Sequence, residues 1–259
     1  DLTNANLSGV DLSGKDLTWT KLTNTNLENT VLTNTILNCV GNSVCSTMDL
    51  SEMTLKGVDL TNANLSGVDL SDRDLTGTIL AGTNLSGKDL TGTILKRADL
   101  TNAKLQDTDL RNTNLRYSNL SFVDLSSSKI MGADARNSNL SNAILQGHHL
   151  SDSFFDGANL SNADLTFTIF RHVGLSGANL SGANISYADL TYANLEFSNL
   201  SRVKLIGSDL SGANLSNANL QNSNLSWSNL FNTDFTNANL EDVIVKNTNL
   251  SCINHEICN

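Results

Sequence analysis

The four cysteines are the residues of this chain best suited to covalent chemistry, and they form two distant pairs. Cys39 and Cys45 lie near the start, and Cys252 and Cys258 repeat the same spacing near the end. We favour two local disulfides, Cys39–Cys45 and Cys252–Cys258, each of which would fasten a short irregular segment. Four free thiols, or metal binding helped by His255, are the alternatives. Disulfides would indicate an oxidising compartment, extracellular or periplasmic, and the cytoplasm stays open.

Histidines and known catalytic motifs offer little for an active site. His148 and His149 are adjacent, and the other two histidines lie far from them in the sequence. No G-x-S-x-G elbow, phosphate-binding loop or H-E-x-x-H motif occurs. We therefore predict a protein that is not an enzyme, with no catalytic residue, no metal site and no cofactor.

Carboxylates and aromatic rings recur at 20-residue steps and are the candidates for an interaction surface. The carboxylates are Asp49, Asp69, Asp89 and Asp109, and the rings are Phe167, Tyr187 and Trp227, with Gly207 in the gap. Solvated charge is the favoured interpretation of the aspartates; a bound cation such as Ca²⁺ and mimicry of nucleic-acid phosphates are the others. Exposed rings serve as contact residues, although stacking on one another explains them equally well.

The spacing of the hydrophobic residues predicts the element that positions these side chains. Every fifth residue from Leu50 to Leu250 is Leu or another apolar residue, and the residue two before it is usually Ala, Ser, Thr or Val. Five residues fit neither an α-helix, where the leucines would spiral around the axis, nor a flat strand, where they would alternate between faces. The spacing fits a square coil, with one pentapeptide on each side and 20 residues per turn.

The residue before the Leu supports the 20-residue turn independently. It is Asn at seven successive 20-residue steps: Asn119, Asn139, Asn159, Asn179, Asn199, Asn219 and Asn239. Stacked amides can hydrogen-bond along strands about 4.8 Å apart. In the same register Ala135 lies one coil from the bulky Phe155, and His148 points inward while His149 points outward.

The unit A-[D/N]-L-[S/T]-x resembles the pentapeptide-repeat family, as in GANLSGAN at 177–184 and NANLQNSNL at 217–225. The resemblance covers nearly the whole chain. It implies an all-β fold, a right-handed quadrilateral parallel β-helix, here of about 12 coils of 20 residues. It implies little about function, because members of one fold family perform many roles.

Departures from the repeat divide the predicted solenoid, which spans 1–259 as a single domain. The N-terminal coils span 1–37, a register break or loop spans 38–49, the main solenoid spans 50–251 and an end segment spans 252–259. The two cysteine pairs are then about 50 Å apart, too far for a bridge or a shared zinc site between them. The first coil has no cap before it, which indicates a missing cap or an end-to-end dimer through that coil.

Charge and composition disfavour some classes of function. The net charge is −10, which disfavours direct binding to nucleic acid, and no apolar run reaches the length of a membrane span. We predict a structural or protein-interaction solenoid, exported, that presents flat walls to an unknown protein or surface partner. The alternative is a DNA-mimicking modulator of a type II topoisomerase (gyrase), a role implied by the resemblance to quinolone-resistance pentapeptide proteins. The cysteines and the absence of a helical pattern in 240–259 count against it.

Overall fold

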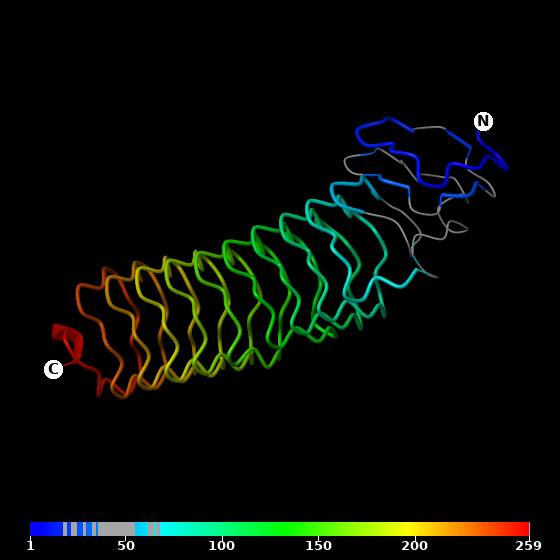
Figure 1. Cartoon of the computed structure of the whole chain (residues 1–259). Helices are drawn as coiled ribbons and strands as arrows, with labels where there is room; N and C mark the ends of the chain where they lie inside the picture. The colour runs from blue at the N-terminus through cyan, green and yellow to red at the C-terminus, as the bar shows by residue number, and fades with distance from the viewer. Residues whose placement is uncertain are drawn as a thin grey trace.

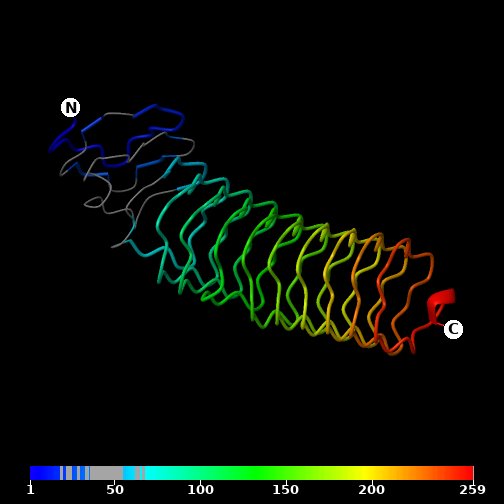
Figure 2. The ribbon, with the colours of Figure 1, turned by 180° about the vertical axis from the view of Figure 1, so that it is seen from behind.

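The chain winds into a stack of coils with its two ends at opposite ends of the stack (Figures 1 and 2). The computed structural model describes residues 1–17, 20–21, 25–27, 30–32, 35, 55–61, 65 and 68–258. Parallel β-bridges join residues 20 positions apart, from Asn6 with Asn26 to Asn229 with Asn249. The predicted 20-residue turn is therefore correct. Each bridge is a single-residue pairing, because the chain turns again before a longer strand can form.

Every side of a coil is one pentapeptide that ends in a tight turn. At Leu100, for example, the N–H of Ala103 donates to the Leu100 carbonyl at 2.9 Å, and Asn102 between them has φ of 54°. A positive φ at this position is the signature of a type II turn, which Gly and Asn adopt most easily. Asn, Asp or Gly two residues after the Leu therefore makes a corner. Four corners close the coil into a quadrilateral parallel β-helix.

Inward-pointing side chains build one continuous core along the described part of the axis. The recurrent Leu residues from Leu55 to Leu230 are buried, together with the small residues two positions before them. Inward hydroxyls also bond to backbone, as the Thr168 Oγ1 does to the Leu145 carbonyl at 3.2 Å. Stacked coils bury one another's apolar layers, so each coil depends on its neighbours for stability.

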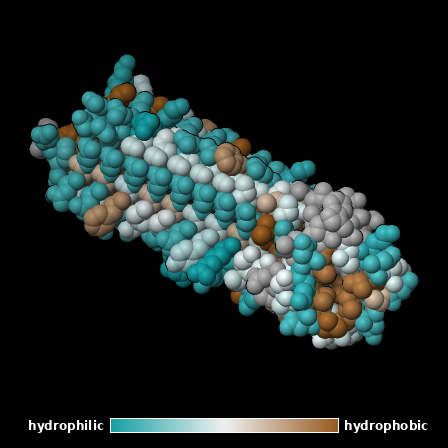
Figure 3. Space-filling model, turned by 90° about the horizontal axis from the view of Figure 1, so that it is seen from above, coloured by the Kyte–Doolittle hydropathy of each residue, from teal (hydrophilic) through white to brown (hydrophobic). Residues whose placement is uncertain are grey.

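Four walls surround this core, and we name each by the residues at the middle of its sides. The asparagine wall contains the column from Asn119 to Asn239. The aspartate wall contains the column from Asp69 to Asp109 and continues to Asp209. The hollow wall contains Asn114, Asp134, Phe154, Gly174 and Asn194, and the fourth wall contains Lys104, Asp124, Ile144, Asp164 and Asn184. Figure 3 shows one face as rows of hydrophilic and intermediate residues that run along the rod.

Near the N-terminal end the coils continue across the predicted register break. The N–H of Asp59 donates to the Thr35 carbonyl at 3.1 Å, whereas the equivalent bond elsewhere joins residues 21 apart, as in Ile79 and Val58. The offset is three residues, the number by which the leucine register slips between Leu37 and Leu50. The predicted loop itself, 38–49, lies outside the described residues.

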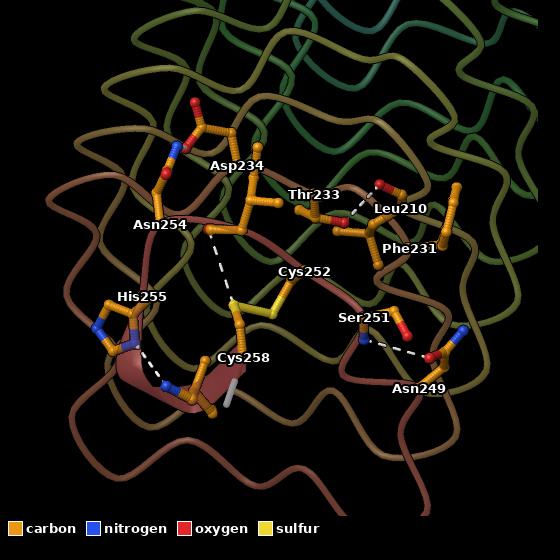
Figure 4. The surroundings of a disulfide bond; sticks show 12 residues. Leu210, Phe231, Thr233, Asp234, Asn249, Ser251, Cys252, Asn254, His255 and Cys258 are labelled. Carbon is orange, nitrogen blue, oxygen red and sulfur yellow. Dashed lines mark hydrogen bonds between the residues drawn. A yellow bond between two sulfur atoms is a disulfide. The ribbon is translucent and has the colours of Figure 1, made fainter.

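At the C-terminal end the repeat gives way to a short fastened segment (Figure 4). Ile253 pairs with Asp234 instead of the residue 20 before it, so this last coil is one residue shorter. The 3-10 helix η1, Glu256–Cys258, follows and is tied back by the Cys252–Cys258 disulfide. Within the described ranges, no helix has the length and apolar character needed to cross a membrane.

Candidate binding surfaces

The first two aspartates of the described column are held by their own backbone. Asp69 accepts a hydrogen bond from the Ser71 N–H at 3.0 Å, and Asp89 accepts one from the Thr91 N–H at 2.9 Å. Hydrogen bonds from these two partners lower the pKa of both carboxyls, in spite of the repulsion that Asp89 feels from Asp69 and Asp109. Hydrogen bonding therefore outweighs like-charge repulsion in this column.

Asp109, the next in the column, is neutralised within the chain. The Arg111 guanidinium binds its carboxylate through two nitrogens at 2.9 and 2.6 Å, and the Lys129 ammonium lies 3.9 Å away. The hydrogen bond from Arg111 is the main cause that lowers the Asp109 pKa to about 2. Lys129, His149 and Ile169 then continue the column, so the acidic run ends here. Asp49 lies outside the described residues.

Aromatic rings at the corner between the fourth and aspartate walls stack as predicted. The Phe167 and Tyr187 rings are nearly parallel, with centroids 5.2 Å apart. The Tyr187 ring lies over Gly207, where a Cβ would come within 2.8 Å of ring carbons. Trp227 follows in the same column and is 64% exposed. Glycine at 207 thus leaves room for the end of the stack.

A second aromatic stack, which was not predicted, lies on the opposite corner of the aspartate wall. The His172 and Tyr192 rings are parallel with centroids 5.2 Å apart, and Tyr192 lies over Gly212. The signal was present as an aromatic corner residue followed 20 positions later by glycine, the same order as in the first stack. Two stacks therefore flank one wall over the same two coils.

These aromatic corner residues occupy backbone conformations that bulky side chains avoid. Seven have φ between 57° and 63°, and all seven are exposed: Tyr117, Phe122, Phe167, Tyr187, Tyr192, Phe197 and Trp227. A bulky side chain held in this region costs on the order of 1–3 kcal/mol, and such strain is concentrated at functional sites. Asparagine or glycine serves most other corners without that cost.

A shallow hollow of about 350 Å³ lies on the hollow wall. It forms where Gly174 offers no side chain, directly beside Phe154 of the preceding coil, a residue that is 47% exposed. The hollow is lined by Asp152, Ser153, Phe154, Asp156, His172, Val173, Gly174 and Asn194. It was not predicted, and its signal is a glycine at a mid-wall position where the repeat places Asp or Asn.

Charged groups around this hollow are arranged by hydrogen bonds. The Asp156 carboxylate accepts a bond from the Ser176 N–H at 3.0 Å across the coils. In neighbouring repeats that N–H bonds to the Asp or Asn two residues earlier, a partner that Gly174 cannot supply. The Arg136 guanidinium lies 5.2 Å from the Phe154 ring centroid and forms a salt bridge with Asp134 at 2.6 Å.

Within the described residues, the adjacent histidines do not form a catalytic arrangement. His148 is buried, its Nε2 lies 2.5 Å from the Leu125 carbonyl, and burial lowers its pKa. His149 is exposed on the other side of the wall, as predicted. No group of three or more His, Cys, Asp or Glu in the described ranges could hold a metal ion.

Of the two predicted disulfides, Cys252–Cys258 is present, with Cα atoms 5.0 Å apart. Cys39 and Cys45 lie outside the described residues, so their pairing stays a prediction. Around the bridge, the Asn254 amide donates to Asp234 at 3.0 Å and the Ile257 N–H donates to the His255 ring at 3.2 Å (Figure 4). His255 is thus used within the end segment.

Comparison with known proteins matches the repeat along nearly the whole chain. A family model described as pentapeptide repeats (8 copies) matches residues 1–38, 48–72, 54–92, 70–107, 93–130, 118–157, 145–177, 158–196, 198–237 and 213–251. No curated protein matches the sequence.

Three solved structures illustrate the similarity. HetL, a pentapeptide repeat protein involved in heterocyst differentiation regulation from the cyanobacterium Nostoc sp. strain PCC 7120, is 26% identical, with 96% of this chain and 90% of that chain covered and a TM-score of 0.36. Rfr23 from the cyanobacterium Cyanothece 51142 is 25% identical, with 44% and 90% covered and a TM-score of 0.36. Full-length QnrB1, a plasmid-mediated fluoroquinolone resistance protein, is 18% identical, with 92% of each chain covered and a TM-score of 0.24.

Proposed function

The chain belongs to the pentapeptide-repeat family, whose fold is a right-handed quadrilateral β-helix, and we propose that it is a non-enzymatic, exported binding protein that presents its walls to a protein partner. A solenoid of this kind offers long surfaces whose side chains are set by the coil register. Its core is continuous, and the hollow on its wall is shallow. This geometry favours surface contact over an enclosed reaction site.

The observation that carries this proposal is the set of exposed aromatic corners around the aspartate wall. Phe167, Tyr187 and Tyr192 are more than half exposed and retain a strained backbone that asparagine would relieve. Tyr and Trp dominate the binding energy of protein interfaces, because they bury a large area at little cost in side-chain entropy. A strained, exposed aromatic cluster is therefore better explained by a contact surface than by stability.

Export is supported by the cysteine chemistry. A disulfide persists in extracellular or periplasmic surroundings and is rare in the reducing cytoplasm. The Cys252–Cys258 bridge fastens the last coil. Titration of the native protein's thiols in denaturant without reductant should find none if both predicted pairs are oxidised, and two if only this pair is. Four reactive thiols would contradict export.

The alternative, a DNA-mimicking modulator of a type II topoisomerase, receives less support. A net charge of −10 favours it. Mimicry of phosphates also needs a sustained run of bare negative charge, since that charge dominates binding to DNA. The aspartate column instead passes from the neutralised Asp109 to Lys129. Protection or inhibition of gyrase supercoiling by micromolar protein would revive this alternative.

Site-specific photo-cross-linking tests the proposed contact surface. A photoreactive phenylalanine analogue is placed at Tyr192, or at Asn142 on a corner of the asparagine wall, where φ is also positive at 59°. After exposure to an extract of the source organism, position 192 should give a discrete protein adduct and position 142 should not. Adducts of equal yield at both positions, or none at position 192, would contradict the proposal.

A further inference from the structure

We propose that the hollow beside Phe154 is a docking site for a basic side chain, an arginine or lysine on an extended segment of the protein partner. This inference rests on the proposed binding function and names the partner's chemistry at one position. It concerns the hollow wall, which adjoins the corner that carries His172 and Tyr192.

The hollow is made by two adjacent departures from the repeat. At the mid-wall position of residues 55–250, the residue before the inward apolar one, Gly174 is the only glycine and Phe154 is the only phenylalanine. The two are paired by a β-bridge in successive coils of the same column. The space left by the absent side chain at Gly174 therefore adjoins the Phe154 ring, and the ring forms one side of the hollow.

Glycine at 174 is not required simply to make room for that ring. The heavy atoms nearest to a Cβ built on Gly174 belong to the Asp156 carboxylate, at 2.7 and 3.0 Å. No positive φ requires glycine there either. The stacks over Gly207 and Gly212 differ, because there the ring carbons themselves come within 2.8 and 2.6 Å. At Gly174 the Asp156 carboxylate instead lies where a side chain would begin, and it borders the hollow.

The charge around the hollow favours a cation. Its lining residues include two carboxylates, Asp152 and Asp156, and neither lysine nor arginine. With the neighbouring Asp134 and the two arginines that act on it, Arg116 and Arg136, included, three carboxylates face two guanidinium groups, an excess of one negative charge. The whole chain adds a net charge of −10, which steers cations towards it and repels anions.

The ring at the edge of the hollow already shows that it accepts a guanidinium. Arg136 lies 5.2 Å from the Phe154 centroid, within the distance at which the ring quadrupole attracts a cation. A second cation in the hollow would meet the exposed part of this ring and the carboxylates of Asp152 and Asp156. A space of about 350 Å³, open to solvent, suits one long basic side chain better than a buried cofactor.

Fluorescence anisotropy with labelled peptides tests the ligand chemistry. The probes are a flexible Arg-Ser peptide, the same peptide with citrulline for arginine, a Glu-Ser peptide, and the neutral sugar maltohexaose as competitor. At about 0.15 M salt, where surface charges are partly screened, the arginine peptide should bind at least tenfold more tightly than the citrulline peptide. Equal binding of the citrulline peptide, or displacement by maltohexaose, would overturn the basic-side-chain assignment.

Gly174→Asn separates the hollow from the general negative charge. The substitution leaves net charge unchanged, fills the hollow, and introduces the residue found at Asn114 and Asn194 in the same column. The Asp156 carboxylate, the far end of a flexible side chain, must move away from the new Cβ, and the introduced amide oxygen can accept the Ser176 N–H in its place. We therefore expect affinity for the arginine peptide to fall at least tenfold with the unfolding midpoint close to that of the wild type. Gly147→Asn is the matched control, since φ there is +74°, no atom lies within 4 Å of its Cβ, and it is outside the hollow. Unchanged affinity in Gly174→Asn would overturn the proposal.

Asp156→Asn gives a second readout that preserves shape. Its amide oxygen can still accept the Ser176 N–H, while one negative charge is lost. Affinity for the arginine peptide should fall severalfold, less than in Gly174→Asn, and an unchanged affinity would contradict the charge argument. If the hollow variants have no effect but the Tyr192 cross-link persists, this inference fails and the proposed function stands. Loss of the cross-link result removes the proposed function as well.

Discussion

The asparagine wall and the hollow wall share one backbone and one register, yet they use their side chains in opposite ways. On the asparagine wall the Asn179 amide donates to Asn159 at 3.1 Å, while its oxygen accepts from Asn199 and from the Ser181 N–H, both at 3.2 Å. On the hollow wall the mid-wall position holds an aromatic ring at Phe154 and no side chain at Gly174. The first wall satisfies its own hydrogen bonds, and the second leaves groups available to a ligand.

That difference separates the residues that build the rod from those that equip it to bind. A side chain that forms hydrogen bonds to both neighbouring coils and within its own repeat has few groups free to bind a partner. Its removal therefore lowers the free energy of unfolding. A side chain whose contacts the repeat does not need can be replaced at small cost to the fold. The comparison therefore predicts that stability and binding respond to different columns.

The largest expected effect on stability is at the asparagine wall. Asn179→Ala removes three hydrogen bonds at once and should lower the free energy of unfolding by about 2 kcal/mol. Urea denaturation followed by circular dichroism measures it. The control is Lys204→Ala, at an exposed mid-wall position of the fourth wall, which should change stability by less than about 0.5 kcal/mol. Equal effects of the two would mean that the ladder contributes nothing.

A pH-dependent effect of intermediate size is expected from inside the aspartate wall. Burial lowers the pKa of His148 below its usual 6.5, so the folded state favours the neutral ring. As pH falls through 6.5 the unfolded chain takes up the proton first, and stability decreases until the folded pKa is reached. His148→Thr replaces the ring with an inward hydroxyl, the group that Thr168 has in the same column.

Thermal unfolding midpoints at pH 7.5 and 5.5 measure the contribution of His148. The wild type should lose more stability on acidification than His148→Thr. His149→Thr is the control, because that ring is exposed and should leave the pH dependence as it is. A wild type and His148→Thr with equal losses would show that the buried ring does not affect stability over this range.

A small effect on stability is expected at the aromatic corners. Tyr192→Asn removes a stack worth about 1 kcal/mol but also relieves a strained φ of 57°, so the two changes should nearly cancel. The unfolding midpoint should stay within a few degrees of wild type, which corresponds to about 1 kcal/mol or less. A loss comparable with that of Asn179→Ala would mean that the rings stabilise the rod and would weaken the case for a contact surface.

The fold was predictable from the sequence because its signals are local and repeated. The five-residue spacing of Leu, the Asn column and the corner residues each limit the chain to one geometry, and the Phe167–Tyr187 stack follows from them by counting in twenties. The neutralisation of Asp109 was harder, since it depends on the Arg111 side chain, two residues along the same repeat, folding back onto the carboxylate. Counting columns does not show how a side chain turns.

The hollow was missed for a different reason. A glycine at position 174 reads as a neutral departure from the repeat until the Asp156 carboxylate is seen to occupy the vacated hydrogen bond. Asp156, in the neighbouring coil, thus accepts the hydrogen bond that a side chain at position 174 would otherwise accept, and the position of a residue within its repeat does not predict such a replacement. The stack of His172 on Tyr192 was likewise not predicted, because the two rings are 20 residues apart in the sequence.

The most direct test of the central claim measures stability and binding together in Asn179→Ala and Gly174→Asn. Urea midpoints and affinity for the arginine peptide are determined on the same preparations. We predict a crossed result: Asn179→Ala loses stability and keeps its affinity, whereas Gly174→Asn keeps its stability and loses at least tenfold in affinity. If both properties change together in either variant, or if Asn179→Ala alone weakens binding, the division between a self-satisfied wall and a binding wall is wrong.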